Sequence, residues 1–269
     1  MSNFSDFIGG GGGSTSFPTI FLHNSQTWVP PQDGNIMIHV IGAGGSGAGS
    51  NNAYQSGGAG GYCRKNSLAV TTSGSFTVVV GAGGASQIGS YGAGTAGGTT
   101  TVAGTGLSAT LTATGGAGGG LVTTAYTTAS TASNGDVNNA GGRGGYEKGG
   151  GAVGLTGTGM DGAELGTVLM TYGGNSDIVG DFYSSSFGQL SGSLGGRSSY
   201  ISDSNGGGGN YDAGPLAGAA GMYGLGNYDF SAGHASIGGG GGFCRNTGYT
   251  ARIFSGRGGE GCVVIQYIV

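Results

Sequence analysis

Residues 36–47 read IMIHVIGAGGSG, in which a run of apolar and β-branched residues leads directly into closely spaced glycines. The same order returns in residues 78–84, VVVGAGG. A strand followed by G-x-G-x-x-G is typical of dinucleotide-binding folds, which also need a helix next and an acidic residue about 20 positions on. Residues 48–62 are helix-breaking instead, and after Asp33 the next acid is Asp136. The repeated phrase therefore predicts architecture, in which glycine lets the protein's own backbone approach, and not a cofactor site.

Glycine dominates the composition, with 71 of 269 residues, while there are only 8 basic and 12 acidic residues. Disordered chains combine low hydrophobicity with high net charge, whereas this chain has a net charge of −4 and many apolar and aromatic residues. Collagen needs glycine at every third position and abundant proline, but here the glycines cluster irregularly and there are 4 prolines. We expect ordered, extended glycine segments of polyproline-II type, stacked backbone against backbone as polyglycine-II-like layers.

The predicted fold is all-β, with short strands forming a sheet or sandwich and long glycine-rich excursions between them. Each predicted strand is rich in β-branched or aromatic residues and is bounded by Gly, Asn or Ser. No segment has a sustained helical period, so almost no helix is expected. The predicted strands are residues 27–29, 35–41, 62–70, 76–80, 99–102, 107–114 and 262–269.

A weak internal repeat organises the first half of the chain. One unit is a strand at 36–41, an excursion at 42–61 and a strand at 62–70; the second is a strand at 76–80, an excursion at 81–98 and strands within 99–114. The last strand, CVVIQYIV, has the continuous apolar pattern of a buried strand. We expect it to return to the early strands and close one domain over residues 27–269.

The usual signatures of enzymes and metal sites are missing. No serine lies in a G-x-S-x-G elbow, no phosphate-binding G-x-x-x-x-G-K is present, and the histidines have no paired spacing. The acidic pairs Asp161/Glu164 and Asp177/Asp181 have no specific signature and are interpreted as solvated loop acids. We therefore expect no enzyme activity, catalytic residue, cofactor or metal, and the acidic balance disfavours nucleic acid.

The cysteines Cys63, Cys244 and Cys262 form an odd set without C-x-x-C spacing. Buried free thiols are the favoured interpretation, and a Cys244–Cys262 disulfide is the alternative. There is no signal-peptide pattern and no apolar run of 18 residues, which predicts synthesis in a cytoplasm and no membrane insertion.

Two regions differ from the scaffold in composition. Residues 1–26 carry apolar side chains around a five-glycine run and are interpreted as a tether or attachment segment, with a frayed terminus as the alternative; the candidate attachment residues are Phe4, Phe7, Ile8, Phe17 and Phe21. Residues 121–236 are predicted to be a loop region rich in Tyr, Ser and Asp. Tyr with Ser, Gly and Asn is a composition that suits recognition surfaces, although these tyrosines could instead simply cover glycine backbone. The candidate receptor-binding residues are Tyr126, Tyr146, Tyr172, Tyr183, Tyr200, Tyr211, Tyr223 and Tyr228.

From residue 27 onward, the order of phrases resembles the glycine-rich domain of bacteriophage tail-fibre and receptor-binding adhesin proteins. The resemblance covers about nine tenths of the chain and rests on the order of strands around the GAGG turns. The matching pieces are TWVPPQDGNIMIHVIGAGGSG (27–47), GGAGGYCRKNSLAVTTSGSFTVVVGAGG (57–84), GGTTTVAGTGLSATLTATGGAGGG (97–120), SNGDVNNAGGRGG (133–145) and GRGGEGCVVIQYIV (256–269).

This resemblance implies a virion appendage tip that attaches a tailed phage to its host through loops on a glycine-rich scaffold. The implied partners are a host cell-surface glycan or outer-membrane protein, and another virion or fibre protein through residues 1–26. A homo-oligomer, with a trimer favoured, is expected. A purely structural virion or surface protein without receptor contact is the main alternative, and an enzyme that degrades surface polysaccharide is a third.

Overall fold

The computed structural model is all-β, with two antiparallel sheets and no helix in the residues that it describes, as the composition predicted. The described residues are 19–50, 55–88, 91–121, 126–145, 158–159, 161, 222–224, 230–231, 238–242, 244–246 and 253–268. Side chains are described for all of them except residues 50, 222–224, 230–231, 244–246 and 253–254.

Two five-stranded sheets face each other as a sandwich. The first has the order β1-β15-β3-β5-β10 and the second β2-β6-β7-β8-β9. The first sheet consists of β1 (Thr19–Leu22), β15 (Cys262–Ile268), β3 (Gly34–Ile41), β5 (Tyr62–Val70) and β10 (Val137–Asn139). The second consists of β2 (Gln26–Trp28), β6 (Phe76–Val79), β7 (Thr100–Gly104), β8 (Leu111–Ala113) and β9 (Ala132–Ser133). Short strands outside the sandwich are β4 (Gly49–Ser50), β11 (Met222–Gly224), β13 (Cys244–Asn246), β12 (Phe230–Ser231) and β14 (Ile253–Phe254).

The core lies between the two sheets and follows the two-residue alternation of their strands. Ile36, Ile38 and Val40 on β3 are fully buried and belong to this core. From the second sheet, the Trp28 and Phe76 rings pack with their centroids 5.5 Å apart. These side chains hold the sheets together, so the strand part of the molecule is stabilised in the ordinary way.

The C-terminal strand joins the earliest strands, as predicted. β15 pairs antiparallel with β3, with Val263 opposite Val40, and with β1, with Thr19 opposite Gln266. The sequence predicts a tether over residues 1–26, but the structure places residues 19–22 inside the first sheet and Gln26 at the start of β2. Residues 1–18 lie outside the described part.

Part of the predicted loop region 121–236 belongs to the scaffold, which corrects the sequence interpretation for residues 126–145. Strand β9 pairs with β8, and β10 pairs with β5 on the other sheet. The turn between them is tight, and Asn134 takes a positive φ of 67° there, a conformation that Asn tolerates better than most residues. These strands are only two and three residues long, too short for a recognisable sequence pattern.

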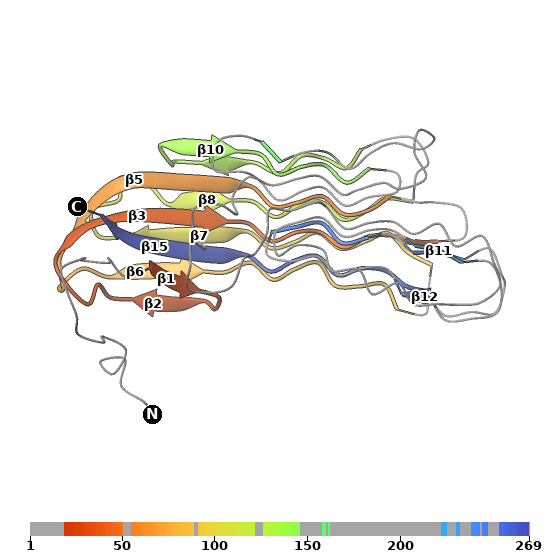
Figure 1. The fold of residues 1–269 in the computed structure, drawn as a ribbon, viewed down its shortest axis with the longest axis horizontal. Helices are drawn as coiled ribbons and strands as arrows, with labels where there is room; N and C mark the ends of the chain where they lie inside the picture. Colours follow the sequence, from red (N-terminus) through yellow and green to blue (C-terminus); the bar gives the residue numbers. More distant parts are fainter. Residues whose placement is uncertain are drawn as a thin grey trace, which may run out of the picture.

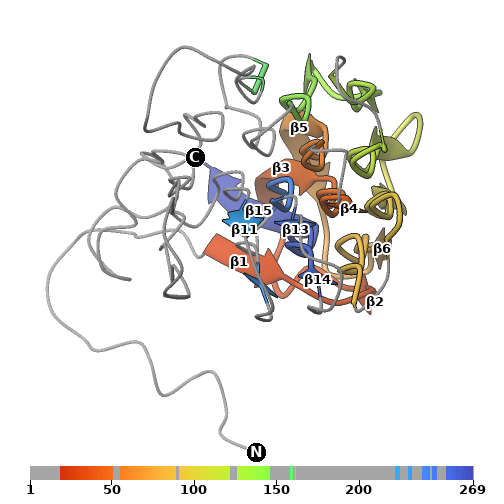
Figure 2. The same cartoon turned by 90° about the vertical axis from the view of Figure 1, so that its right-hand side faces the viewer.

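Beyond the sandwich, eight strands continue as extended segments that run side by side away from the sheets (Figure 1). In Figure 2, which looks along this axis, several segments project as small triangles, as expected for three residues per turn. The first sheet continues into residues 42–48, 55–61, 140–145 and 255–261, and the second into 81–87, 92–98, 114–120 and 126–131. We call this array, together with residues 238–242, the glycine lattice.

Segment 42–48 demonstrates the rule by which the lattice is built. Its amides donate in turn to three neighbouring segments and return to the first after three residues. A β-strand would instead alternate between two neighbours, so the geometry is of polyproline-II type. The bonds are Gly42 N to Gly61 O, Ala43 N to Gly98 O, Gly44 N to Gly259 O, Gly45 N to Gly58 O, Ser46 N to Thr95 O and Gly47 N to Gly256 O, at 2.8–3.2 Å.

The carbonyls of the same segment accept from three further segments, so six neighbours surround it. These bonds are Gly116 N to Ala43 O, Gly84 N to Gly44 O, Gly241 N to Gly45 O and Gly119 N to Ser46 O, at 2.8–2.9 Å. Stacked sheets ordinarily lie ~10 Å apart because side chains fill the space between them. In the lattice that space is absent: a Cβ added at Gly45 would lie 2.2 Å from Ala117 O. Glycine is therefore required here by backbone contact, which confirms the predicted role of the GAGG phrase.

Hydroxyl side chains complete the lattice where the backbone register leaves a donor without a carbonyl. Ser46 is fully buried, and its Oγ accepts from Thr95 N at 2.8 Å. The buried Thr127 and Ser255 act in the same way, accepting from Gly144 N and Gln87 N, each at 2.8 Å. The few polar side chains inside the lattice are thus part of its hydrogen bonding.

Substituting Ser46→Ala should lower the free energy of unfolding by about 1 kcal/mol, because it removes the acceptor of the part-buried hydrogen bond from Thr95 N. Chemical denaturation followed by circular dichroism measures this change. Ser73→Ala is the matched control, since Ser73 bonds only to Thr71 on the surface, and it should change the stability by less than ~0.5 kcal/mol. Equal effects of the two substitutions would show that Ser46 has no such role.

Candidate functional site at the distal end of the glycine lattice

The sandwich lies at one end of the described structure, and the outer ends of the lattice segments lie at the other (Figure 1). Thr19 pairs with Gln266, so β1 begins beside the end of β15. From the sandwich the segments run outward to the far end, where the ends of two of them meet, since Ala48 N donates to Gln55 O at 3.0 Å. Figure 1 shows the segments extending from the sheets along the long axis. We call the outer ends of the lattice segments the distal end.

At the distal end, one predicted receptor-binding tyrosine lies in a defined cluster. Tyr126 begins segment 126–131, and the Arg143 guanidinium lies over its ring, 4.5 Å from the centroid. Asp161 accepts from Arg143 N at 2.6 Å, from Nε at 2.9 Å and from Nη2 at 2.6 Å. Asp161, interpreted from sequence as a solvated loop acid, is therefore held against the lattice.

Electrostatics keep this pair ionised. The hydrogen bond and charge of Asp161 raise the pKa of Arg143. Burial opposes ionisation of Asp161, but the hydrogen bonds and charge of Arg143 outweigh it, so the pKa of Asp161 lies below its usual value. The two groups remain half-exposed. The cluster can therefore present an aromatic ring beside an arginine that is largely neutralised by its partner.

Replacing Asp161→Asn should loosen residues 158–161 locally while changing global stability by at most about 1 kcal/mol, because exposed ion pairs contribute little. The nearby amide of Gly159, which donates to Ala140 O at 2.9 Å, should then exchange with solvent faster than in the unsubstituted chain. Amide exchange measured by NMR tests this. An unchanged rate at Gly159 would mean that Asp161 does not fix this segment.

Of the predicted site residues that the structure describes, it brings no other to Tyr126. Tyr223 lies on β11, with only its backbone described, and Phe21 lies on β1, half-buried and stacked on His23. The remaining candidates lie outside the described residues: Tyr146, Tyr172, Tyr183, Tyr200, Tyr211, Tyr228, Phe4, Phe7, Ile8 and Phe17. Sequence reasoning missed Arg143, although it is an isolated base between Asp136 and Glu147.

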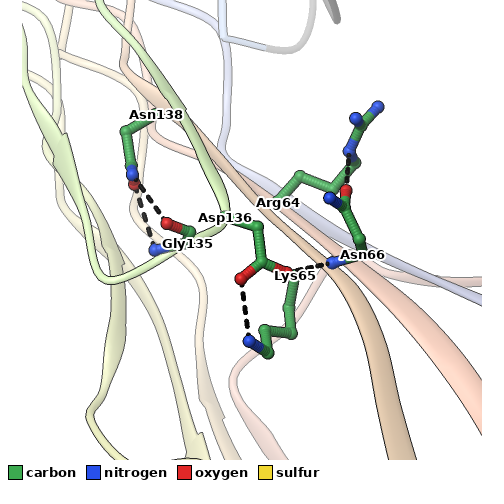
Figure 3. A network of polar contacts seen from close by, with 6 residues as sticks. All are labelled: Arg64, Lys65, Asn66, Gly135, Asp136 and Asn138. Carbon is green, nitrogen blue, oxygen red and sulfur yellow. Dashed lines mark hydrogen bonds and ion pairs between the residues drawn. The ribbon is translucent and has the colours of Figure 1, made fainter.

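A polar network fixes the turn between β9 and β10 onto β5 (Figure 3). Asp136 accepts from Lys65 Nζ at 2.8 Å and from Asn66 N at 2.7 Å. The hydrogen bond from Lys65 is the main reason that the pKa of Asp136 is lowered. Asn138 closes the turn with two bonds to the Gly135 backbone. These partners all belong to β5 or to the turn and strand that it holds, so we interpret the network as structural.

A second network is buried in the first sheet. His39 Nδ1 lies 2.7 Å from Tyr62 Oη and its Nε2 lies 3.2 Å from Gln266 Oε1. Burial lowers the pKa of His39 to about 4, opposed by its hydrogen bond to Gln266 and assisted by the charge of Arg64. The imidazole is therefore neutral at pH 7, where it links three strands.

The cysteines behave as the favoured interpretation predicted where the structure describes them. Cys63 and Cys262 are both buried free thiols, so the alternative Cys244–Cys262 disulfide is not formed. Burial raises the pKa of each to about 12, and the thiols stay protonated. Within the described residues, no group of three or more potential metal ligands gathers, and no helix there is long and apolar enough to cross a membrane.

In the lattice, consecutive amides bond to three different segments, and backbone contact leaves no room for side chains at many positions. These features define the class of this protein as an all-β, glycine-rich domain. Comparison with known families agrees: residues 20–268 match the glycine-rich domain family, and the chain belongs to it. No curated protein matches the chain.

Proposed function

We propose that this chain is the adhesive tip of a virion appendage, which attaches a tailed phage to its host through the distal end of the glycine lattice. The observation that carries the proposal is the placement of the outer ends of the lattice segments opposite the beginning of β1 and the end of β15 (Figure 1). A chain attached through the residues that precede β1 would present the distal end outward. The resemblance to phage tail-fibre adhesins motivates the biological setting.

The lattice supports this role because it is rigid without bulky side chains. Each interior segment bonds to several neighbours, so its outer end is held by the array and not by one strand pair. A preorganised surface loses less conformational entropy on binding. Several copies on one virion would then raise the effective affinity without new contacts.

The test uses a phage that carries this chain and its propagation host. Fluorescently labelled full-length protein should bind host cells saturably and should compete with phage adsorption, whereas heat-unfolded protein should do neither. Flow cytometry and adsorption counts measure the two effects. Folded protein that neither binds cells nor slows adsorption would overturn the adhesin proposal and leave the structural alternative.

Attachment to the virion through the N-terminal segment is tested separately. Deleting residues 1–18 removes Phe4, Phe7, Ile8 and Phe17 but leaves β1 intact. We expect the deleted chain to fold and to be missing from purified virions, as measured by mass spectrometry. Normal incorporation would contradict attachment through this segment.

The purely structural function is favoured by one observation, the dense backbone bonding of the lattice, which suits mechanical resistance with no ligand at all. Exchanging residues 146–221 between family members, which leaves β9 and β10 in place, separates the two functions. Host range should follow the exchanged region only if the chain is an adhesin.

A further inference from the structure

We infer that Ile88, Tyr91 and Leu121 form a neutral apolar patch at the distal end that contacts a protein on the host surface. The inference rests on the proposed adhesive function and specifies its partner. None of the three was among the tyrosines predicted as receptor-binding residues.

The hydrogen-bond register brings the three residues to one edge of the lattice. Gly94 N donates to Gly119 O at 2.7 Å, and Gly97 N donates to Gly116 O at 2.9 Å. These segments run antiparallel, so the same register continued outward places Gly92 opposite Leu121. Tyr91 therefore lies beside Leu121 at the ends of two adjacent segments.

Ile88 belongs to the same edge. A Cβ added at Gly92 would lie 3.0 Å from Gln87 Oε1, so the segment that ends near residue 88 lies against the one that begins at Tyr91. Gln87 also fixes this end, because its N donates to Ser255 Oγ and its O accepts from Ser255 N, at 2.8 and 3.0 Å. The side chains thus project from three neighbouring segments of the layer that continues the second sheet.

All three side chains are exposed although they are large and apolar. The exposed fractions are 67% for Ile88 and 51% for both Tyr91 and Leu121. Exposed apolar residues that gather in one place mark interaction sites more often than scattered ones do. In a lattice made almost entirely of glycine and small residues, three such side chains at the ends of adjacent segments are available to a partner.

The charge around the patch decides which partner it suits. No Asp, Glu, Lys, Arg or His lies between Lys65 and Asp136 in the sequence, so the segments that carry the patch have no charge of their own. The charged side chains that adjoin this layer are in ion pairs, Arg257 with Glu260 and Arg143 with Asp161. Anionic lipids and phosphorylated glycans are held by lysine and arginine, and the patch segments have neither.

The side-chain types argue against neutral glycans as well. Ile88 and Leu121 cannot hydrogen-bond sugar hydroxyls, and covering those hydroxyls with aliphatic groups has a desolvation cost. A protein surface with an apolar patch meets no such cost, and tyrosine is enriched among the residues that dominate protein interfaces. The chemistry therefore favours a protein partner.

The binding experiment compares full-length protein with the triple variant Ile88→Ser/Tyr91→Ser/Leu121→Ser on host cells, using flow cytometry across a concentration series. We expect the apparent affinity to fall at least about tenfold, since hot-spot residues commonly have effects of that size. The control variant Val29→Ser/Val79→Ser removes two exposed apolar side chains of the sandwich, Val79 at the end of β6 and Val29 directly after β2. Its apparent affinity should stay within about twofold of that of the unsubstituted protein. Thermal melts check that each variant is folded, and Tyr91→Ala alone replaces the triple variant if that chain does not fold.

Treating the cells separates the possible partners. Protease treatment of the host cells should abolish binding, and periodate oxidation of their glycans should not. Binding lost only after periodate, or kept after both treatments, overturns the inference in favour of a glycan or a lipid. If the unsubstituted protein and the patch variant bind host cells equally well, the inference is overturned and the proposed function stands. If the unsubstituted protein does not bind at all, both the inference and the proposed function are overturned.

Discussion

Replacing Gly45→Ala is expected to destabilise the protein by about 3 kcal/mol or more, the upper range for overpacked interiors. The added Cβ would lie 2.2 Å from Ala117 O and 2.5 Å from Ala117 C, which are backbone atoms that cannot rotate away. Moving that segment would strain its own bonds, since Gly58 N donates to Ala117 O. The free energy of unfolding from urea denaturation measures the effect.

The matched control is Gly92→Ala, also in the lattice. There the nearest atom to an added Cβ is Gln87 Oε1 at 3.0 Å, the far end of a flexible side chain. This substitution should change the stability by less than about 1 kcal/mol. A Gly45→Ala variant as stable as Gly92→Ala would mean that the segments are not in backbone contact.

The sandwich is expected to lose about 3 kcal/mol of stability as the pH falls from 6.5 towards 4, because of His39. Its pKa is about 4 in the folded protein, against an ordinary value of 6.5. Between these values the unfolded chain binds a proton that the folded chain does not, so acidification favours unfolding. One pKa unit corresponds to about 1.4 kcal/mol, which sets the size of the loss. Urea denaturation at a series of pH values measures it.

His39→Gln should remove this acid-dependent loss, since glutamine does not titrate. Tyr62→Phe is the control, because it deletes the hydroxyl beside Nδ1 but leaves the imidazole buried. The Tyr62→Phe variant should be less stable at pH 7, but its free energy of unfolding should fall with decreasing pH as steeply as that of the unsubstituted protein. If the stability of His39→Gln falls with decreasing pH as steeply as that of the unsubstituted protein, other groups cause the acid sensitivity.

The long strands were predictable because burial leaves a pattern in their sequences. The β-branched runs at 35–41, 62–70 and 262–269 match β3, β5 and β15 closely. Strands β9 and β10 were missed because they have two and three residues, and their conformation comes from pairing with β8 and β5. Local sequence contains little of that information.

The character of the glycine segments was also predictable, but their neighbours were not. Glycine content indicates close backbone approach, while the choice of Gly98, Gly259 and Gly58 as partners of consecutive residues depends on how the strands are arranged in the sandwich. The apolar patch was missed for a related reason. Ile88 and Leu121 are far apart in sequence, and only the lattice register places their segments on either side of the segment that follows Tyr91.

The lattice is tested most directly by NMR scalar couplings across hydrogen bonds in uniformly labelled protein. The amide nitrogens of Ala43, Gly44 and Gly45 should couple to the carbonyl carbons of Gly98, Gly259 and Gly58, respectively. Three consecutive residues would then bond to three different segments, which only a threefold helix allows. Couplings from alternate residues to one segment would indicate an ordinary strand, and their absence with fast amide exchange would indicate no lattice; either result would contradict this account.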